Sequence, residues 1–364
     1  MASRLTSMYL LLHMLAGHVN GIQVLRADSA DNLCEDGRVA PELILIGAPR
    51  CSTTTFSVNF MQSSEVTLGQ CIESEKAQSL LLRRQSSDES LLLRRQSSDE
   101  SVHRLERANL TLDGCAPSGI KEMHFFNANY QEGPEAKARY LSHYPTCETQ
   151  QRLVAADLTP DHHTMPEVPA RIAQLYGSQA RKIKFITLVR DPLEQMRSFY
   201  YYEHAENHRS FKDYVESMVA SPAARLKYFR YLNNANIAGG IQNFLDVFGP
   251  SQIYVVPYQY ETTRKHGLPR AHEFMWDELG LPHAPAQEEI DGVNGHAHPS
   301  LTDEGIDEAT FSSLRELIYG ITGPQAIARI IADAASSGKS MHLYGYTGSQ
   351  SNVDKIAAWI EDGW

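Results

Sequence analysis

Three short apolar runs constrain the fold of this chain most, because helical patterns alternate with them. The runs are Leu43–Gly47, Lys184–Val189 and Ile253–Val256; a loop and a helix-compatible stretch follow the first two, and the amphipathic segment Ile237–Phe248 precedes the third. Uninterrupted apolar runs of this length are typical of strands buried on both faces, and strands that alternate with helices form parallel sheets. The sequence therefore predicts a three-layer α/β fold, with a central parallel sheet flanked by helices.

Charge and cysteine spacing exclude two classes of site. The 33 basic and 44 acidic residues give a formal net charge of -11, which repels nucleic acid at long range. We therefore expect no nucleic-acid partner, and any anion site must be local. The 5 cysteines show no CxxC pair and no Cys/His cluster at metal-ligand spacing, so we expect no metal site. Their odd number does not decide the redox compartment.

The N-terminal segment has the pattern of a targeting signal. Arg4 precedes the apolar run Met8–Val19, which has about the length of the apolar core of a signal peptide. Asn109 begins an N-glycosylation triplet, Asn-Leu-Thr, which fits exposure in the lumen. We expect export into the secretory pathway, with the N-terminus either cleaved or kept as a membrane anchor.

A tandem duplication marks a surface insertion. The sequence SLLLRRQSSDE occupies Ser79–Glu89 and again Ser90–Glu100, and two copies do not make a solenoid. We expect this insert to be solvated and assign it no chemistry. The expected organisation is a signal peptide or anchor over 1–27, a stem over 28–40, the main domain over 41–345 with the insert at about 73–108, and a tail over 346–364.

The first chemical motif is Pro41–Thr55, in which a strand enters a loop of small and hydroxylated residues and then a helix. Such a junction directs backbone N–H groups and the positive end of a helix dipole at an anion. Arg50 adds a full charge, and Ser52, Thr53 and Thr54 add hydroxyl donors. An NTPase loop of the form GxxxxGK[ST] does not fit, because Thr53 stands where the lysine belongs. The motif predicts a P-loop-like phosphate or sulfate site, or else a plain turn with one exposed arginine.

The second motif is Lys121–Phe126, where Glu122 precedes an apolar, aromatic run that resembles a strand. A carboxyl held there would have its pKa raised by desolvation and could act as a general base. The alternative is that Glu122 is a solvated surface charge. We expect His124 to be a packed histidine rather than a catalyst.

The third motif is Phe185–Ser198, a second strand that leads into a helix. Asp191 fits the N-cap and Pro192 the first helical position. Arg190 stands at the strand end and Ser198 about two helical turns later, so the two side chains could hold a second phosphate. The alternative is that Arg190 simply pairs with Asp191.

These three strings, in this order, resemble the carbohydrate sulfotransferases that use 3'-phosphoadenosine 5'-phosphosulfate (PAPS). The resemblance is strongest to the heparan sulfate glucosaminyl 3-O-sulfotransferases and N-sulfotransferases. It covers roughly Pro41 to Glu316 apart from the duplicated insert, and it includes the later string Gly295–Pro299.

The resemblance implies a role for each matching position. The loop would wrap the 5'-phosphosulfate, Arg190 and Ser198 would hold the 3'-phosphate, and Glu122 would deprotonate the acceptor. A late loop would close over the nucleotide. The implied loop residues are Arg50, Cys51, Ser52, Thr53 and Thr54, with Arg50 in place of the family's lysine, and the late-loop residues are Gly295, His296 and His298. The implied co-substrate is PAPS without a metal, the implied partner is a poly- or oligosaccharide acceptor, and the implied location is the Golgi lumen.

Several positively charged residues of the family are replaced by other residues in this chain. The family's Lys-Gly-Gly reads Arg50-Cys51-Ser52 here, a family lysine is replaced by Leu158, and the family's lysine and arginine of the late loop read Asn294 and His296. Arginine does not replace lysine neutrally. Two alternatives therefore remain: a non-catalytic lumenal protein that binds glycans or nucleotides, and a P-loop nucleotide kinase.

Overall fold

The computed structural model describes residues 32–70, 121–127, 130–148, 152–204, 210–221, 223, 229–262, 268–283, 304–346 and 348–362. The described residues belong to one compact unit that begins at Asn32. The N-terminal apolar run, the duplicated insert, the glycosylation triplet and the late loop at Gly295 lie outside them. In the described part of the chain, no helix is both long and apolar enough to cross a membrane.

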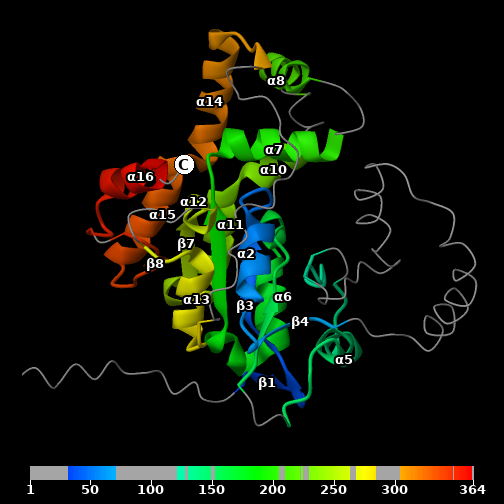
Figure 1. Ribbon diagram of the computed structural model, residues 1–364. Coiled ribbons are helices and arrows are strands. Elements are labelled where there is room, and N and C mark those ends of the chain that lie inside the picture. Colours follow the sequence, from blue (N-terminus) through cyan, green and yellow to red (C-terminus); the bar gives the residue numbers. More distant parts are fainter. Residues whose placement is uncertain are drawn as a thin grey trace, which may run out of the picture. The chain divides into compact units, whose positions relative to one another are not determined.

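A six-stranded parallel sheet forms the centre of this unit (Figure 1). Its order is β4–β5–β3–β6–β7–β8, and every neighbouring pair is parallel. The strands are β3 (Pro41–Gly47), β4 (Val66–Leu68), β5 (Val154–Asp157), β6 (Lys184–Val189), β7 (Ile253–Pro257) and β8 (His342–Leu343). The three apolar runs of the sequence are β3, β6 and β7, so the predicted α/β fold with a central parallel sheet is confirmed.

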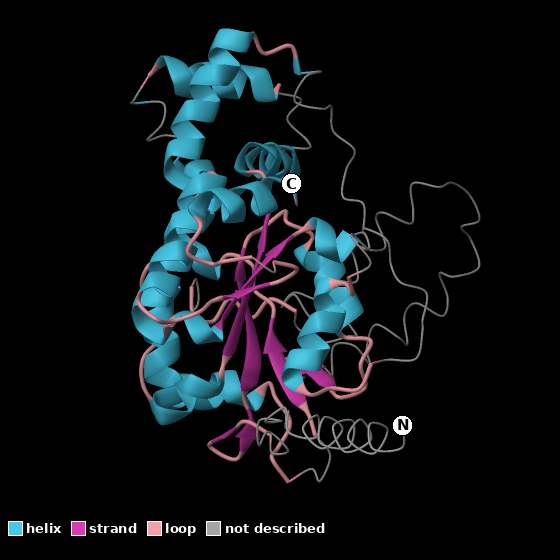
Figure 2. Cartoon of the chain, turned by 90° about the vertical axis from the view of Figure 1, so that its left-hand side faces the viewer, coloured by secondary structure: helices cyan, strands magenta, loops and turns pink. Residues whose placement is uncertain are grey.

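Helices cover both faces of the sheet (Figure 2). Helix α13 (Ala271–Leu279) is bonded to α2 (Thr53–Phe60), because the indole Nε1 of Trp276 donates to the carbonyl oxygen of Phe60 at 3.0 Å. The predicted amphipathic segment forms α11 (Ile237–Phe248), which packs against α6 (Val168–Tyr176). The helices are α2 (Thr53–Phe60), α5 (Pro134–Ser142), α6 (Val168–Tyr176), α7 (Pro192–His204), α8 (Phe211–Ala220), α10 (Phe229–Ala235), α11 (Ile237–Phe248), α12 (Gln259–Thr262), α13 (Ala271–Leu279), α14 (Glu308–Thr322), α15 (Pro324–Ser336) and α16 (Val353–Asp362).

Burial explains why the middle of the central strand β3 is apolar. Every residue of β3 is buried, and the side chains from Leu43 to Ile46 are 0% exposed. A strand between two helical layers has no solvent face, so alternation of polar and apolar residues disappears. Each such side chain contributes about 1.5–3 kcal/mol by leaving water. This rigid strand fixes the position of the loop that follows it.

A second, aromatic core lies between α7, α8, α10 and α14. Tyr200 is at its centre, with ring centroids of Tyr214 at 5.0 Å and Phe211 at 5.5 Å. The Tyr319 hydroxyl of α14 donates to the Asp191 carboxylate, which stands at the start of α7. These helices are thereby fastened to the loop that ends β6, next to the strand ends described below.

The folded unit extends beyond the expected domain boundary at residue 41. A hairpin of β1 (Cys34–Glu35) and β2 (Arg38–Val39) precedes β3, and Leu33, Val39 and Ala40 are buried in the main core. Cys34 forms a disulfide with Cys147, across a Cα–Cα distance of 6.1 Å. Much of the expected stem is therefore part of the domain, because its apolar residues are covered by the core.

The expected tail is likewise folded. Helix α16 packs on α15, and its Ile356, Ala357 and Ile360 are buried. These three residues recur at helical spacing, which produces one apolar face on an otherwise polar helix. The structure therefore places residues 348–362 within the same unit as the sheet.

Candidate functional site

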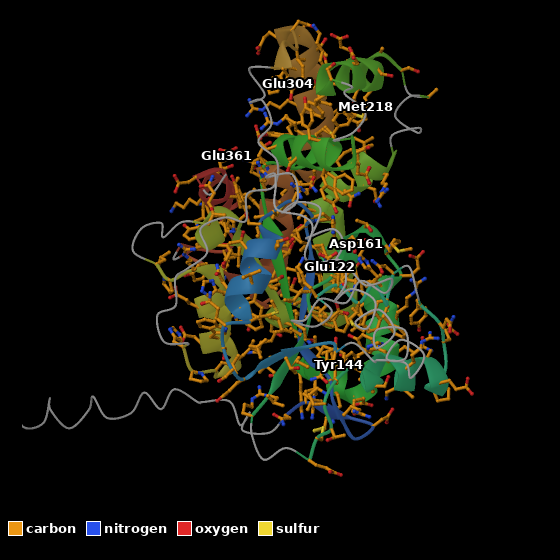
Figure 3. The ribbon with its side chains drawn as sticks, turned by 45° about the vertical axis from the view of Figure 1, so that its right-hand side comes forward. Glu122, Tyr144, Asp161, Met218, Glu304 and Glu361 are labelled. Carbon is orange, nitrogen blue, oxygen red and sulfur yellow. A yellow bond between two sulfur atoms is a disulfide. The ribbon has the colours of Figure 1, made fainter. Side chains whose placement is uncertain are left out.

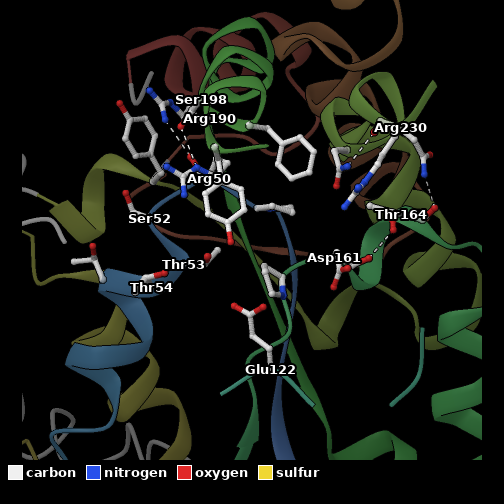
Figure 4. A pocket seen from close by; sticks show the side chains of 18 of the residues that line it. Arg50, Ser52, Thr53, Thr54, Glu122, Asp161, Thr164, Arg190, Ser198 and Arg230 are labelled. Carbon is white, nitrogen blue, oxygen red and sulfur yellow. Dashed lines mark hydrogen bonds between the residues drawn. The ribbon is translucent and has the colours of Figure 1, made fainter. Parts of the chain in front are cut away.

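A cavity of about 740 Å³ opens at the carboxyl ends of the central strands (Figure 4). The chain leaves β3 toward β4 on one side of the sheet and leaves β6 toward β7 on the other. Open α/β sheets bind their ligands at such a switch point. Polar residues that follow four strands line this cavity: Arg50 after β3, Asp161 after β5, Arg190 after β6 and Tyr258 after β7.

The predicted anion loop forms one wall of the cavity. Ser52, Thr53 and Thr54 line it, and α2 begins at Thr53. The first amides of a helix have no carbonyl partner within the helix, so the N-terminus of α2 offers donors to an anion. The loop is tightly bent: Arg50 and Ser52 have positive φ of 68° and 59°. Non-glycine residues adopt this left-handed conformation at a cost of about 1–2 kcal/mol each.

The side chain of Cys51, another residue of the predicted loop, lies outside the cavity. Its side chain is 0% exposed and does not line the cavity, and its backbone N–H donates to the carbonyl of Ala48 at 3.2 Å. Burial raises the pKa of the Cys51 thiol to about 12. The residue packs inward because the loop turns its side chain into the core, so its contribution is structural.

Arg50 reaches from the loop to α7. Its Nε donates to the Ser198 hydroxyl at 3.1 Å, and its guanidinium lies 4.8 Å from the centroid of the Tyr202 ring. Burial lowers the pKa of Arg50, opposed by Tyr202, although a guanidinium stays charged at neutral pH. Ser198 was expected to act beside Arg190, whereas the structure pairs its hydroxyl with Arg50. The reason is that α7 directs Ser198 at the anion loop.

Arg190 binds the backbone of the same loop. Its Nη1 donates to the carbonyl oxygen of Arg50 at 3.0 Å, its Nη2 lies 3.6 Å from the Glu194 carboxylate, and its guanidinium lies 5.0 Å from the Tyr258 ring centroid. Asp191 instead caps α7, accepting N–H bonds from the next turn at 2.9 Å. The predicted N-cap is confirmed, and the alternative of an Arg190–Asp191 pair is wrong.

The Lys121–Phe126 segment is an irregular loop and not the strand that its apolar residues suggested. The Leu158 N–H donates to the Lys121 carbonyl at 3.1 Å, and the His124 N–H donates to the Thr159 hydroxyl at 3.2 Å. His124 has a positive φ of 48°. Bonds to the loop after β5 replace a strand ladder and turn both Glu122 and His124 into the cavity.

Glu122, His124 and Asp161 form a chain of charged groups. Figure 3 labels the two carboxylates of this chain, Glu122 and Asp161. His124 Nε2 lies 3.4 Å from Glu122 Oε2, and His124 Nδ1 lies 3.4 Å from Asp161 Oδ1. Asn127 donates to Asp161 Oδ1 at 2.8 Å, and the Lys121 ammonium contacts the Glu122 carboxylate. An imidazole between two carboxylates is held as a cation.

The pKa values of this chain of groups correct the prediction for Glu122. Burial raises the pKa of the Glu122 carboxyl, but the hydrogen bond from His124 and the charge of Lys121 outweigh burial, and the pKa is lowered. The bonds to Asp161 and Glu122 raise the pKa of His124 to about 10. Asp161 also has a lowered pKa, because the His124 cation outweighs its burial. Glu122 is therefore ionised at neutral pH, and the expected increase in its pKa is wrong.

The far wall of the cavity carries Arg230 and Asn233. Arg230 Nη1 lies 2.7 Å from Glu203 Oε1, and its guanidinium lies 5.6 Å from the Phe199 ring centroid. Asn233 donates to the Thr164 carbonyl at 2.8 Å. These residues come from helices that follow β6 and from the turn after β5.

Several residues that line the cavity were not among the site residues expected from the sequence. His124 was expected to be a packed residue, and Asp161, Tyr202, Arg230 and Tyr258 were not among the candidates. The sequence position of two of these residues could have indicated the site, because Asp161 closely follows β5 and Tyr258 closely follows β7. Polar residues at the carboxyl ends of parallel strands are candidates for a site.

The remaining predicted residues lie outside the described part of the chain. These are Gly295, His296 and His298 of the late loop. Within the described ranges, no group of three or more His, Cys, Asp or Glu residues could hold a metal ion.

Comparisons with known proteins find a distant structural likeness. No family model matches the chain, and no curated protein matches it in sequence. The structure is similar to a sulfotransferase from Alicyclobacillus acidocaldarius, with a TM-score of 0.42 and 14% sequence identity, over 77% of this chain and 96% of that chain. A likeness of this degree assigns neither a reaction nor a substrate.

Proposed function

We propose that this protein is a sulfotransferase that moves the sulfonate group of PAPS to a hydroxyl or amino group of a carbohydrate. One observation carries the proposal. Arg50 and Arg190 end adjacent strands, are joined by the 3.0 Å bond from Arg190 Nη1 to the backbone carbonyl of Arg50, and line one cavity with the ionised Glu122. Two cations suit a nucleotide that bears phosphate groups at both ends, and the carboxylate suits the acceptor.

The donor would lie along the anion loop. The 5'-phosphosulfate would accept bonds from the N-terminus of α2 and from the hydroxyls of Ser52, Thr53 and Thr54. The 3'-phosphate would lie nearer Arg190 and Ser198, which the three-motif resemblance to sulfotransferases also implies. The local cations would offset the repulsion that a chain of net charge -11 exerts on an anion.

The reaction would be an in-line transfer. The acceptor oxygen or nitrogen forms a bond to sulfur, the bond between sulfur and the bridging 5'-phosphate oxygen breaks, and Glu122 takes the acceptor proton. The negative charge that develops on the bridging oxygen is stabilised by Arg50 and the helix amides. His124, held by Asp161, stays cationic beside Glu122 and orients its carboxylate. Positioning and charge stabilisation do most of the work, as in phosphoryl transfer.

Nucleotide preference is the first test. Isothermal titration calorimetry with adenosine 3',5'-bisphosphate and with ATP plus magnesium separates a sulfotransferase from a nucleotide kinase. We expect the bisphosphate to bind and ATP with magnesium to bind much more weakly. Tight binding of ATP with magnesium, together with no binding of adenosine 3',5'-bisphosphate, would favour the nucleotide kinase.

Transfer itself is the second test. Purified protein is incubated with ³⁵S-labelled PAPS and a broad glycan panel, beside the Glu122→Gln variant. We expect the variant to bind the bisphosphate normally and to lose about 100-fold or more in turnover, because general base catalysis contributes about 10²–10⁴-fold. Near-normal turnover by the variant would remove Glu122 from this role. Nucleotide binding without transfer to any glycan would favour a non-catalytic protein.

The disulfide favours the expected location. Cys34 and Cys147 are bonded, and disulfides persist in oxidising compartments. Together with the signal-like N-terminus, this supports the secretory pathway, and the Golgi lumen as the site where glycans are sulfonated.

A further inference from the structure

The cavity has two walls of different electrical character (Figure 4). Arg50, Arg190 and Ser198 lie on the side of the anion loop, whereas Asp161, Thr164 and Arg230 lie across from them, beyond Glu122. If the donor occupies the first wall, the acceptor meets the second. The second wall therefore decides what kind of acceptor is used.

Each charge near the second wall is compensated by a neighbour. Arg230 pairs with Glu203 at 2.7 Å, and the His124 cation lies between two carboxylates, at 3.4 Å from each. Lys121 contacts Glu122. Among the described residues that line this wall, Arg230 is the sole arginine or lysine, and its exposed side chain contacts the Glu203 carboxylate. Among the described residues of this wall, a polyanionic acceptor would meet a single arginine, whose charge Glu203 offsets.

Asp161 presents an acceptor atom to the cavity. Its Oδ1 receives the bonds of Asn127 and His124, whereas Oδ2 receives no hydrogen bond from a described side chain. The side chain is 35% exposed and lines the cavity. A carboxylate oxygen at such a position suits the hydroxyl groups of a sugar and repels a carboxylate or sulfate group.

We infer that the acceptor is an uncharged, hydroxyl-rich saccharide whose hydroxyl groups bind Asp161, and not a sulfated polyanion. The inference rests on the proposed function, since it places the acceptor opposite the donor. It departs from the heparan-sulfate-like acceptor that the sequence resemblance implies. Arginine- and lysine-rich surfaces are what polyanion binding requires, and they make binding strongly salt-dependent.

The experiment compares acceptors of different charge. Protein saturated with adenosine 3',5'-bisphosphate is titrated with uncharged oligosaccharides, among them chitotetraose and cellotetraose, and with heparan sulfate. Labelled transfer from PAPS to each is measured at about 50 and about 300 mM NaCl. We expect at least one uncharged oligosaccharide to be sulfonated about 10-fold more efficiently than heparan sulfate, with a KM that changes less than about two-fold with salt.

The outcomes separate the inference from the proposed function. If the bisphosphate does not bind, the proposed function fails, and the inference fails with it. If the bisphosphate binds but heparan sulfate is the better acceptor, or no uncharged oligosaccharide binds, the inference alone is overturned.

A charge variant tests whether pairing with Glu203 keeps Arg230 from binding a polyanion. Glu203→Gln removes the negative charge that pairs with Arg230. Glu203 itself does not line the cavity, so every lining residue keeps its identity. We expect inhibition by heparin to strengthen about 3- to 10-fold. The matched control is Glu216→Gln, which removes the same charge from an exposed pair with Lys212 on α8. Equal effects of the two variants would show that only net charge matters and would overturn the inference.

Asp161→Asn tests the acceptor contact. We expect a higher KM for the uncharged oligosaccharide, by about 10-fold, with an unchanged affinity for adenosine 3',5'-bisphosphate. A fall in kcat with an unchanged KM would limit Asp161 to holding His124 and would overturn its role in binding the acceptor.

Discussion

Arg190 donates from Nη1 to the backbone carbonyl of Arg50 at 3.0 Å, and this bond joins the loops that end two neighbouring strands. Arg50 in turn donates to Ser198 on the helix that follows Arg190. The loops that end β3 and β6 are therefore linked to each other. If the cavity binds a nucleotide as proposed, we expect its binding to depend on both loops.

The first prediction concerns this link. Arg190→Ala removes a charge and frees the loop carbonyl, so we expect affinity for adenosine 3',5'-bisphosphate to fall about 10- to 100-fold in calorimetry. Arg190→Lys keeps the charge but loses the planar guanidinium, and should be intermediate. Arg181→Ala is the control, because Arg181 is exposed and precedes β6, whereas Arg190 follows the other end of that strand. An unchanged affinity in Arg190→Ala would remove this residue from the site.

The second prediction concerns backbone strain in the anion loop. Ser52 has a φ of 59°, and its side chain makes no capping bond to α2. Ser52→Gly should raise the free energy of unfolding by about 0.5–1 kcal/mol, because relief of strain exceeds the added freedom of the unfolded chain. Urea unfolding measures this difference. Ser52→Ala keeps the strain and should not be stabilised. Equal stability of the two variants would contradict the left-handed backbone conformation at position 52.

The third prediction concerns the pH dependence of turnover. Because the pKa of Glu122 is lowered, its carboxylate persists below the ordinary range of a glutamate, and turnover should decrease on the acid side only below about pH 4.5. A base with a raised pKa would instead lose activity at about pH 6–7. His124→Asn suits the left-handed backbone and removes the cation, so the acid limb should move to higher pH. An acid limb near neutrality in the unchanged protein would contradict this ion pairing.

The fourth prediction concerns His124 itself. Its bonds to Asp161 and Glu122 raise its pKa to about 10, so an NMR titration should find the ring protonated throughout the neutral range. A raised pKa stabilises the folded state fully below the unfolded value, about 6.5, and this stabilisation is lost as the pH rises toward 10. The stability difference between the natural protein and His124→Asn should therefore shrink between pH 6 and about pH 9.5. An ordinary histidine pKa would contradict the geometry.

The fifth prediction concerns the disulfide. Cys34 and Cys147 are 113 residues apart, so their bond restricts a long loop of the unfolded chain. Cys34→Ser should lower the free energy of unfolding by about 2–5 kcal/mol. Mass spectrometry after alkylation without reductant should leave Cys34 and Cys147 unlabelled in the natural protein. Labelling of both would contradict the bond.

Local pattern determined the framework of this protein. Strands β3, β6 and β7 and helix α11 were predicted from apolar runs and helical spacing, because those signals lie within one segment of sequence. The cap at Asp191 was predicted for the same reason. The pairing of β3 with β6 makes Arg50 and Arg190 neighbours, since residues that end adjacent parallel strands meet at one edge of a sheet.

Contacts between distant segments decided the chemistry. The apolar run after Glu122 resembled a strand, yet bonds to the loop after β5 made it a turn and brought His124 between two carboxylates. The direction of the Glu122 pKa shift follows from this arrangement, because a nearby cation outweighs burial. Sequence alone determined where the strands end and which charges stand there. Only the tertiary structure decided which charges compensate one another, because electrostatic interactions depend on distance in space and not along the chain.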